Sequence, residues 1–210
     1  MEATSATEVQ EAELAQWLFT AFAPSQLIAS ELGLIPEMQL AFGIDAKILA
    51  PTARGPGDID VLAVNATCPE QTVSIEVKRV KMSSDSYLTS QANKLQGLEK
   101  GSNQVGLLRE IGFHRSYLLV AVVADGREQT KVNFAFQGPT STLVKAVKEK
   151  LCSISFHPDV GVVVVEVTQP VDKSIQDSGA IGIWTHQRAS MIQQPLELTA
   201  KIASFLQVSR

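Results

Sequence analysis

Two short segments of the chain alternate charged and apolar side chains with the two-residue period of a β-strand. In the first segment, Asp58 and Asp60 share one face. In the second, Glu76 and Lys78 share one face, and Glu76 follows Asp60 by sixteen positions. If the two strands form a hairpin, three carboxylates and one ammonium gather on one sheet. This pattern strongly constrains the fold, because like charges repel and partly buried charge is costly.

A divalent cation held by these carboxylates would remove the repulsion between them. Magnesium prefers oxygen ligands, and a bound metal ion makes a coordinated water more acidic. The motif therefore predicts a metal-dependent hydrolytic site. The alternative is a pair of solvated strand faces, on which Glu76 and Lys78 only form cross-strand ion pairs.

The bulk composition is that of one folded domain spanning residues 1–210, with 45% hydrophobic and 19% charged residues. No apolar run reaches the roughly 18 residues that cross a bilayer, so we expect no membrane association. No basic segment precedes an apolar one at the N-terminus, as a secretory signal would require. Cys68 and Cys152 are far apart in the sequence and have no metal-ligand spacing. We therefore expect free thiols and a cytoplasmic location.

Positive charge concentrates in the part of the chain that carries the motif. Residues 1–46 hold seven acidic and no basic side chains, whereas residues 47–150 hold 14 basic and 10 acidic ones. The net charge of the whole chain is −4. The basic middle segment is compatible with a nucleic-acid partner. The alternative is that an acidic first helix merely skews the count.

Apolar periodicity and turn residues predict alternating helices and strands. The predicted helices span residues 7–22, 25–32, 86–111 with a break near Gly101, 139–152 and 195–207. The predicted strands span residues 38–42, 45–49, 58–64, 72–80, 117–124, 131–136, 153–156 and 161–168, with a further apolar stretch at 181–184. This order predicts an α/β fold with a mixed sheet and helices on both faces.

The motif resembles that of the PD-(D/E)XK nuclease superfamily, whose restriction endonuclease-like fold is shared by restriction enzymes and archaeal Holliday junction resolvases. The resemblance covers about residues 25–125 and rests on Asp60, on Glu76-Val77-Lys78 and on the following helix rich in Gln and Lys. The Gly-Asp-Ile-Asp-Val form is closest to the resolvase-like and restriction-like branches. Ile59 replaces the literal Pro of the motif, a departure that the family tolerates. The strands and helices of residues 126–210 would complete the same domain.

The resemblance implies a Mg²⁺- or Mn²⁺-dependent endodeoxyribonuclease of cytoplasmic location that acts on duplex or branched DNA. Asp60 then corresponds to the metal-bridging aspartate, Glu76 to the second metal ligand and the carbonyl of Val77 to a third. Lys78 corresponds to the lysine that positions or deprotonates the attacking water. Many relatives cut as dimers, so a homodimer is expected. The alternative is a catalytically silent nuclease-like module that binds nucleic acid or a protein.

Other candidate residues are less fixed by the motif. Asp58 either contributes to a second metal ion or lies in solvent at the strand edge. The family often has a further metal-facing glutamate on its first helix, and Glu31 is our prediction for it. The competing acids are Glu11, Glu13 and Glu37. In the helix after the motif, Gln91 and Lys94 are predicted to contact the phosphate or the lysine, with Lys100 and Gln104 as alternatives.

The remaining chemistry-bearing residues form no second motif. His114, His157 and His186 are scattered and lack the spacing of a ligand pair. The one Gly-Pro-Gly stretch, at residues 55–57, has neither the Lys-Ser/Thr nor the helix of a phosphate-binding loop. We therefore expect no nucleotide cofactor.

Overall fold

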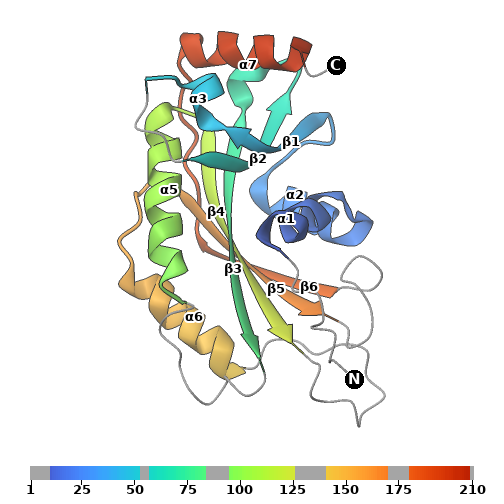
Figure 1. The fold of residues 1–210 in the computed structure, drawn as a ribbon, viewed down its shortest axis with the longest axis vertical. Coiled ribbons are helices and arrows are strands. Elements are labelled where there is room, and N and C mark those ends of the chain that lie inside the picture. The colour runs from blue at the N-terminus through green and yellow to red at the C-terminus, as the bar shows by residue number, and fades with distance from the viewer. Residues whose placement is uncertain (1–9, 53–56, 84–94, 126–140, 170–179, 209–210) are drawn as a thin grey trace, which may run out of the picture.

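The computed structural model describes residues 10–52, 57–83, 95–125, 141–169 and 180–208. Figure 1 shows one mixed sheet with helices on both sides. The strands are β1 (Met38–Asp45), β2 (Asp58–Asn65), β3 (Val73–Ser83), β4 (Arg115–Asp125), β5 (Gly161–Gln169) and β6 (Ala180–Gln187). The helices are α1 (Glu11–Thr20), α2 (Phe22–Leu32), α3 (Ala46–Leu49), α5 (Gly97–Ile111), α6 (Ser141–Ser153) and α7 (Leu196–Val208), and a 3₁₀ turn, η1, spans Pro69–Gln71.

The six strands lie in the order in which they occur along the chain. β1, β2 and β3 form an antiparallel meander, β3, β4 and β5 run parallel, and β6 is antiparallel to β5. The parallel strands β4 and β5 read as continuous apolar runs because both of their faces are covered. The predicted α/β class with a mixed sheet and helices on both faces is therefore confirmed.

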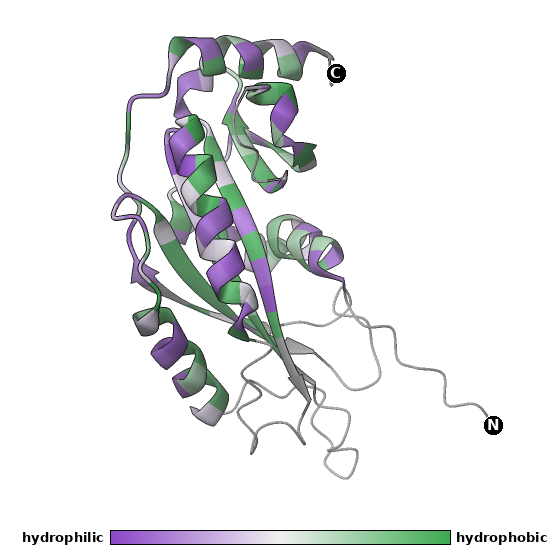
Figure 2. Ribbon diagram, turned by 60° about the vertical axis from the view of Figure 1, so that its left-hand side comes forward, coloured by the Kyte–Doolittle hydropathy of each residue, from purple (hydrophilic) through white to green (hydrophobic). Residues whose placement is uncertain are grey.

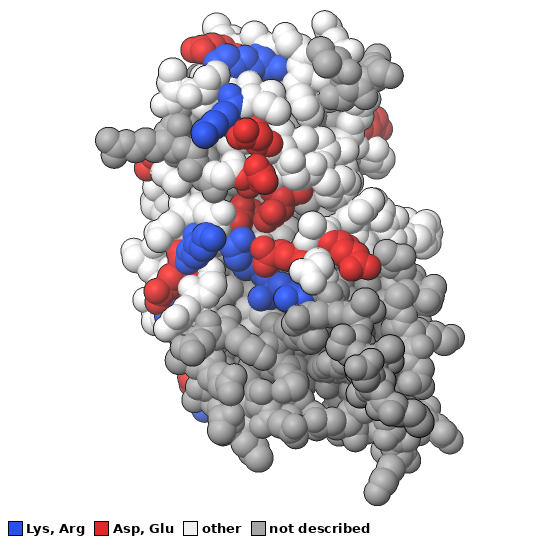
Figure 3. Space-filling model, viewed as in Figure 1, with Lys and Arg blue, Asp and Glu red and all other residues white. Residues whose placement is uncertain are grey.

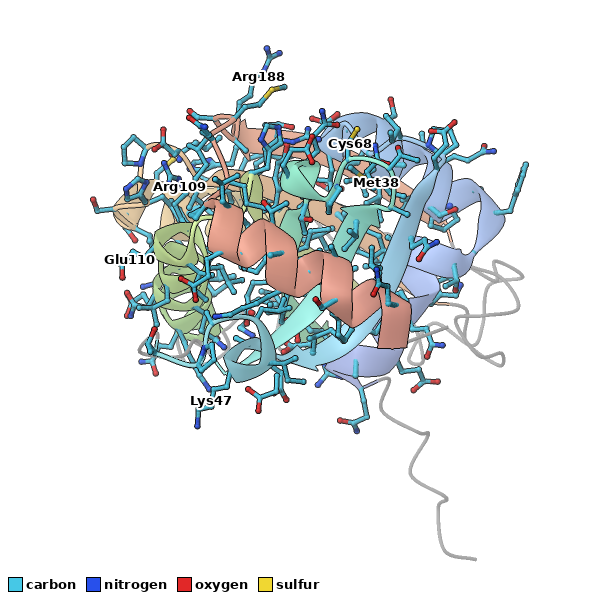
Figure 4. All side chains as sticks on the ribbon, turned by 90° about the horizontal axis from the view of Figure 1, so that it is seen from above. Met38, Lys47, Cys68, Arg109, Glu110 and Arg188 are labelled. Atoms are coloured by element: carbon cyan, nitrogen blue, oxygen red, sulfur yellow. The ribbon has the colours of Figure 1, made fainter. Side chains whose placement is uncertain are left out.

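Helices α1 and α2 cover one face of the sheet, where Leu14 and Leu18 of α1 pack onto alternate residues of β2 to β5. On the opposite face, α5 and α6 cover β4 and β5 through Leu98, Val147 and their neighbours. A third cluster joins α3 and α7 to β2. Figure 4 looks down on that end of the molecule, with α7 across the view and Met38 and Cys68 on the same side of it.

Figure 2 shows the same layering by hydropathy, with the apolar side of α5 and α6 turned toward the sheet. None of the helices in the described ranges is long and apolar enough to cross a membrane. Both cysteines lie in those ranges and neither forms a disulfide.

Three local predictions are wrong, each for a physical reason. Residues 45–49 do not form a strand, because the Asp45 side chain accepts the Lys47 N–H and caps α3. Helix α5 continues through Gly101 without a break. Residues 153–156 are not a strand, because α6 extends to Ser153 and an irregular segment follows. The predicted strand at 131–136 lies outside the described residues.

Candidate active site

The antiparallel pairing of strands β2 and β3 ends at the predicted motif. They pair through Val61–Ile75, Leu62–Ser74 and Ala63–Val73, and the ladder ends there. β3 continues alongside β4 as far as Ser83. Among the described residues, no strand therefore covers the β2-facing edge of β3 beyond Ile75. Asp60 and Glu76 are the first residues past the end of the ladder, one on each strand.

Carboxylates take the place of the missing strand at this open edge. The N–H groups of alternate strand residues point to the same edge and need acceptors there. The Val77 N–H donates to Asp60 Oδ2 at 2.7 Å, and the Arg79 N–H donates to Glu11 Oε2 at 2.9 Å. Glu11 comes from the first turn of α1. Two acidic side chains from different elements are thus fixed at the opening.

The ammonium of Lys78 lies among three oxygen atoms at the same place. Its Nζ is 2.6 Å from Glu76 Oε1, 3.1 Å from the Val77 carbonyl oxygen and 3.3 Å from Glu11 Oε1. The Lys78 side chain is only 13% exposed. Figure 3 shows acidic and basic side chains meeting across the middle of this face, over β2, β3 and α1.

Glu76 is the most deeply buried of the charged groups, with its side chain 1% exposed. Its Oε1 pairs with Lys78, whereas its Oε2 is buried and has no hydrogen-bond partner. Burial, followed by the nearby carboxylate of Asp60, raises the pKa of Glu76 to about 7. A buried carboxylate oxygen without a partner is costly, and protonation or a cation would relieve it.

The neighbouring groups respond to the same excess of negative charge. Burial raises the pKa of Asp60, and the Val77 N–H and the Lys78 charge offset only part of this effect. Burial alone would lower the pKa of Lys78, but the surrounding carboxylates outweigh it and raise that pKa. Among the described side chains whose contacts define the opening, Glu11, Asp60 and Glu76, when ionised, face the single ammonium of Lys78. Two negative charges are left over.

The donors at the opening are of the kind that Mg²⁺ and Mn²⁺ prefer. They are the unpaired Glu76 Oε2, the carboxylate of Asp60 and the carbonyl of Val77. Within the described ranges, no three Asp, Glu, His or Cys side chains are grouped so that they could hold a metal ion on their own. A metal ion here would therefore need the backbone carbonyl and water as further ligands.

The structure brings Asp60, Glu76, Val77 and Lys78 together, as the motif predicts. Asp58 is exposed and lies on β2 opposite Asp45 of β1, so it does not join the buried group. Gln91 and Lys94 lie outside the described residues. The alternatives Lys100 and Gln104 lie on α5, and Lys100 is exposed.

The prediction of Glu31 as a metal-facing glutamate needs correction. Its carboxylate receives the hydroxyl hydrogen bond of Thr185 on β6, which is three strands away from β3. At about 4.8 Å per strand, this distance excludes a shared cation. Glu11, one of the competing acids, lies at the opening instead.

A signal for Glu11 was present in the sequence. Glu11, Leu14 and Leu18 follow the three- and four-residue spacing of one helix face, and the two leucines are fully buried against the sheet. An acid on that stripe must point toward the sheet, whereas Glu13 is exposed.

Comparisons with known proteins give no relative of this chain. No protein-family model, curated protein or solved structure matches it. The function is therefore inferred from the chemistry of the site.

Proposed function

We propose that the chain is a Mg²⁺- or Mn²⁺-dependent nuclease that hydrolyses DNA phosphodiester bonds, with Asp60, Glu76 and Lys78 in its active site. The observation that carries the proposal is the buried, unpaired Oε2 of Glu76 beside a second carboxylate. Leaving such a group unsatisfied costs about 1–3 kcal/mol or more.

The charge balance supports the same proposal. The two negative charges left over at the opening match the charge of one divalent cation. The low exposure of Glu76 and Lys78 strengthens electrostatic interactions there.

Each residue at the opening has a separate task in this proposal. Asp60, Glu76 and the Val77 carbonyl would hold the cation. When bound, the cation would acidify a water molecule and offset charge on the phosphate. Lys78 supplies a hydrogen-bond donor and a positive charge without being a metal ligand. Glu11 fixes the ammonium of Lys78 and the backbone of Arg79.

The test is cleavage of supercoiled plasmid, linear duplex and branched DNA in Mg²⁺, Mn²⁺ or EDTA. The wild type should cut with either metal and not in EDTA. Glu76→Gln and Lys78→Met should each lose at least about a thousandfold in rate, because several kcal/mol of transition-state stabilisation disappear.

The exposed ion pair between Lys145 and Glu149 of α6 provides the matched control. Glu149→Gln and Lys145→Met make the same chemical changes away from the opening and should cut at the wild-type rate. A folded wild type that cuts none of the substrates in Mn²⁺ would contradict the proposal.

The second candidate is a nuclease-like module that binds nucleic acid or a protein without cutting. It is favoured by the Lys78 ammonium, which already contacts Glu76, Val77 and Glu11, and by the lack of a three-carboxylate metal group in the described ranges. Retention of DNA by folded wild type in a gel-shift assay, without cleavage in either metal, would select this candidate.

A further inference from the structure

Helix α5 lies along β3, as Figures 1 and 2 show. Gly101 of this helix lies against Lys78 of β3. Gly101 is buried. A Cβ atom at this position would lie 2.7 Å from Cγ of Lys78 and 2.9 Å from Cδ1 of Leu118. Both distances are shorter than the closest approach of two non-bonded carbon atoms, so the neighbouring atoms would have to move. The stem of Lys78 therefore occupies the space that a side chain at position 101 would need.

The helix itself gives no reason for a glycine here. Glycine in a helix interior is less stable than alanine by about 1 kcal/mol. Gly106 of the same helix has no atom within 4 Å of a would-be Cβ. Gly101 thus differs from Gly106 in what it contacts, which is the lysine of the candidate active site.

The contact lies near the base of the Lys78 side chain. A clash with the tip of a lysine is relieved by bending the side chain, whereas a clash at Cγ is relieved by a change of the Lys78 rotamer or by a shift of α5 away from β3. A different rotamer would carry the ammonium away from Glu76 Oε1, 2.6 Å distant, and from the Val77 carbonyl, 3.1 Å distant.

We propose that Gly101 is a positioning residue that keeps the Lys78 ammonium against Glu76 and the Val77 carbonyl, where it would weaken the binding of a divalent cation. This inference rests on the proposed metal-dependent function. The ammonium contacts the Val77 carbonyl oxygen, which would also be a metal donor, and Oε1 of the Glu76 carboxylate, whose Oε2 would bind the metal, so its positive charge would oppose metal binding. A variant in which the ammonium has moved away should bind the metal more tightly.

The test is a double-mutant cycle on the full chain, with Mn²⁺ alone as the probe and its free concentration followed by electron paramagnetic resonance. Gly101→Ala and Lys78→Met should each bind Mn²⁺ at least about tenfold more tightly than wild type. The double variant should bind no more tightly than Lys78→Met. Gly106→Ala, the matched control, should leave the affinity unchanged.

The cycle separates positioning from a merely structural role. Methionine keeps the Cγ atom of lysine and an unbranched stem, with sulfur in place of Cδ, so any loss of thermal stability caused by the added methyl group at position 101 should persist in the Lys78→Met background. The effect of that methyl group on Mn²⁺ affinity should vanish there, because no charge remains to be moved. An unchanged affinity in Gly101→Ala, or an equal change in both backgrounds, would overturn the inference.

A second measurement does not depend on metal. Acylation of the Lys78 amine, followed by mass spectrometry, should be slow in wild type because the side chain is 13% exposed. It should be faster in Gly101→Ala and unchanged in Gly106→Ala. If none of the variants binds Mn²⁺, the proposed function fails, and the labelling rate alone decides the role of Gly101. A wild-type labelling rate in folded Gly101→Ala would refute that role.

If Gly101→Ala does not fold, Leu118→Val in the same chain shortens the second neighbour of the added Cβ. The Lys78 contact remains, so the same affinity and labelling comparisons apply, with Leu118→Val alone as the reference.

Discussion

Ser74 and Glu76 lie two residues apart on β3 and share one face of the sheet, but their surroundings differ. Ser74 lies where β2 still pairs with β3, and its Oγ is 2.9 Å from Ser116 Oγ of β4. Both serines are fully buried, and each is the other's partner. Glu76 lies just past the end of the ladder, equally buried, with one oxygen unpaired and with an excess of negative charge around it.

The comparison distinguishes buried polar groups that stabilise the fold, such as Ser74, from buried polar groups that cost folding free energy, such as Glu76. In the paired half of β3, removing a polar atom should destabilise the protein. In the open half, removing a buried carboxylate charge should stabilise the metal-free protein and abolish the proposed cleavage. Stability changes of opposite sign in the two halves are expected where part of a strand forms a binding site for a ligand.

The largest effect should come from Asp60→Asn in the open half. The variant keeps an oxygen that can accept the Val77 N–H but loses the charge that would hold a cation. We expect DNA cleavage to fall at least about a thousandfold, with the fold retained. Steady-state cleavage rates measure the loss of activity, and circular dichroism measures the retention of the fold. Cleavage within a few-fold of wild type would remove Asp60 from the mechanism.

Glu76→Gln should stabilise the metal-free protein at high pH. The folded-state pKa of Glu76 is about 7, above its ordinary value of 4.5, so the folded state binds more protons between these two pH values. The wild type should therefore lose stability as pH rises from about 4.5 to about 7, by up to about 3 kcal/mol, and show no such loss below this window.

Because glutamine does not ionise, Glu76→Gln should lack that loss and exceed wild type in free energy of unfolding at pH 8. Urea unfolding in EDTA at pH 4.5 and pH 8 measures it. The exposed Glu149→Gln is the control. Equal pH dependence in wild type and Glu76→Gln would contradict the burial argument.

The paired half of β3 should respond with the opposite sign. Ser74→Ala leaves the Ser116 hydroxyl buried without its partner and should cost about 1–3 kcal/mol of folding free energy. Ser74→Ala/Ser116→Ala removes both hydroxyls and should cost less than the sum of the single variants. Urea unfolding of the wild type, the two single variants and the double variant gives the coupling free energy between the two serines. Additive losses would show that the serines act independently.

The smallest effect should be that of Glu11→Gln. Glutamine retains an oxygen for the Arg79 N–H but loses the charge beside Lys78. Because Glu11 is 38% exposed, solvent screens this charge, and we expect cleavage to fall by about tenfold. Glu31→Gln, the comparison variant, should cleave at the wild-type rate. If Glu31→Gln instead cleaved more slowly than Glu11→Gln, Glu31 would again be the predicted metal-facing glutamate.

The sequence predicted the residues of the site better than it predicted their surroundings. Two-residue periodicity, a local property of strands, placed Asp58 with Asp60 and Glu76 with Lys78 on common faces, and the resemblance then selected Asp60, Glu76 and Lys78. The parting of β2 from β3 is not local, because nothing in either segment shows where the ladder ends. Helix spacing places Glu11 on the face toward the sheet, but it does not show that Glu11 contacts Lys78 and Arg79, which lie 67 and 68 positions away.

The errors in secondary structure have the same origin. A glycine in a helix predicts a weak point, but Gly101 is packed against Lys78 and Leu118, and α5 continues through it. The apolar residues at 45–49 were compatible with a strand, and the cap supplied by Asp45 selected a helical turn instead. In both cases a specific contact overrode the general preference.

The opening between β2 and β3 also gives the site two built-in reporters. The amide hydrogens of Val77 and Arg79 are protected by Asp60 and Glu11, whereas those of Val73 and Ile75, on the same edge of β3, lie where β2 pairs with β3. An amide protected by one side chain exchanges with solvent whenever that side chain turns away, without any unfolding of the sheet. The exchange rates of these two amides therefore report how often Asp60 and Glu11 turn away. They can be measured with any substrate or metal present and in any variant.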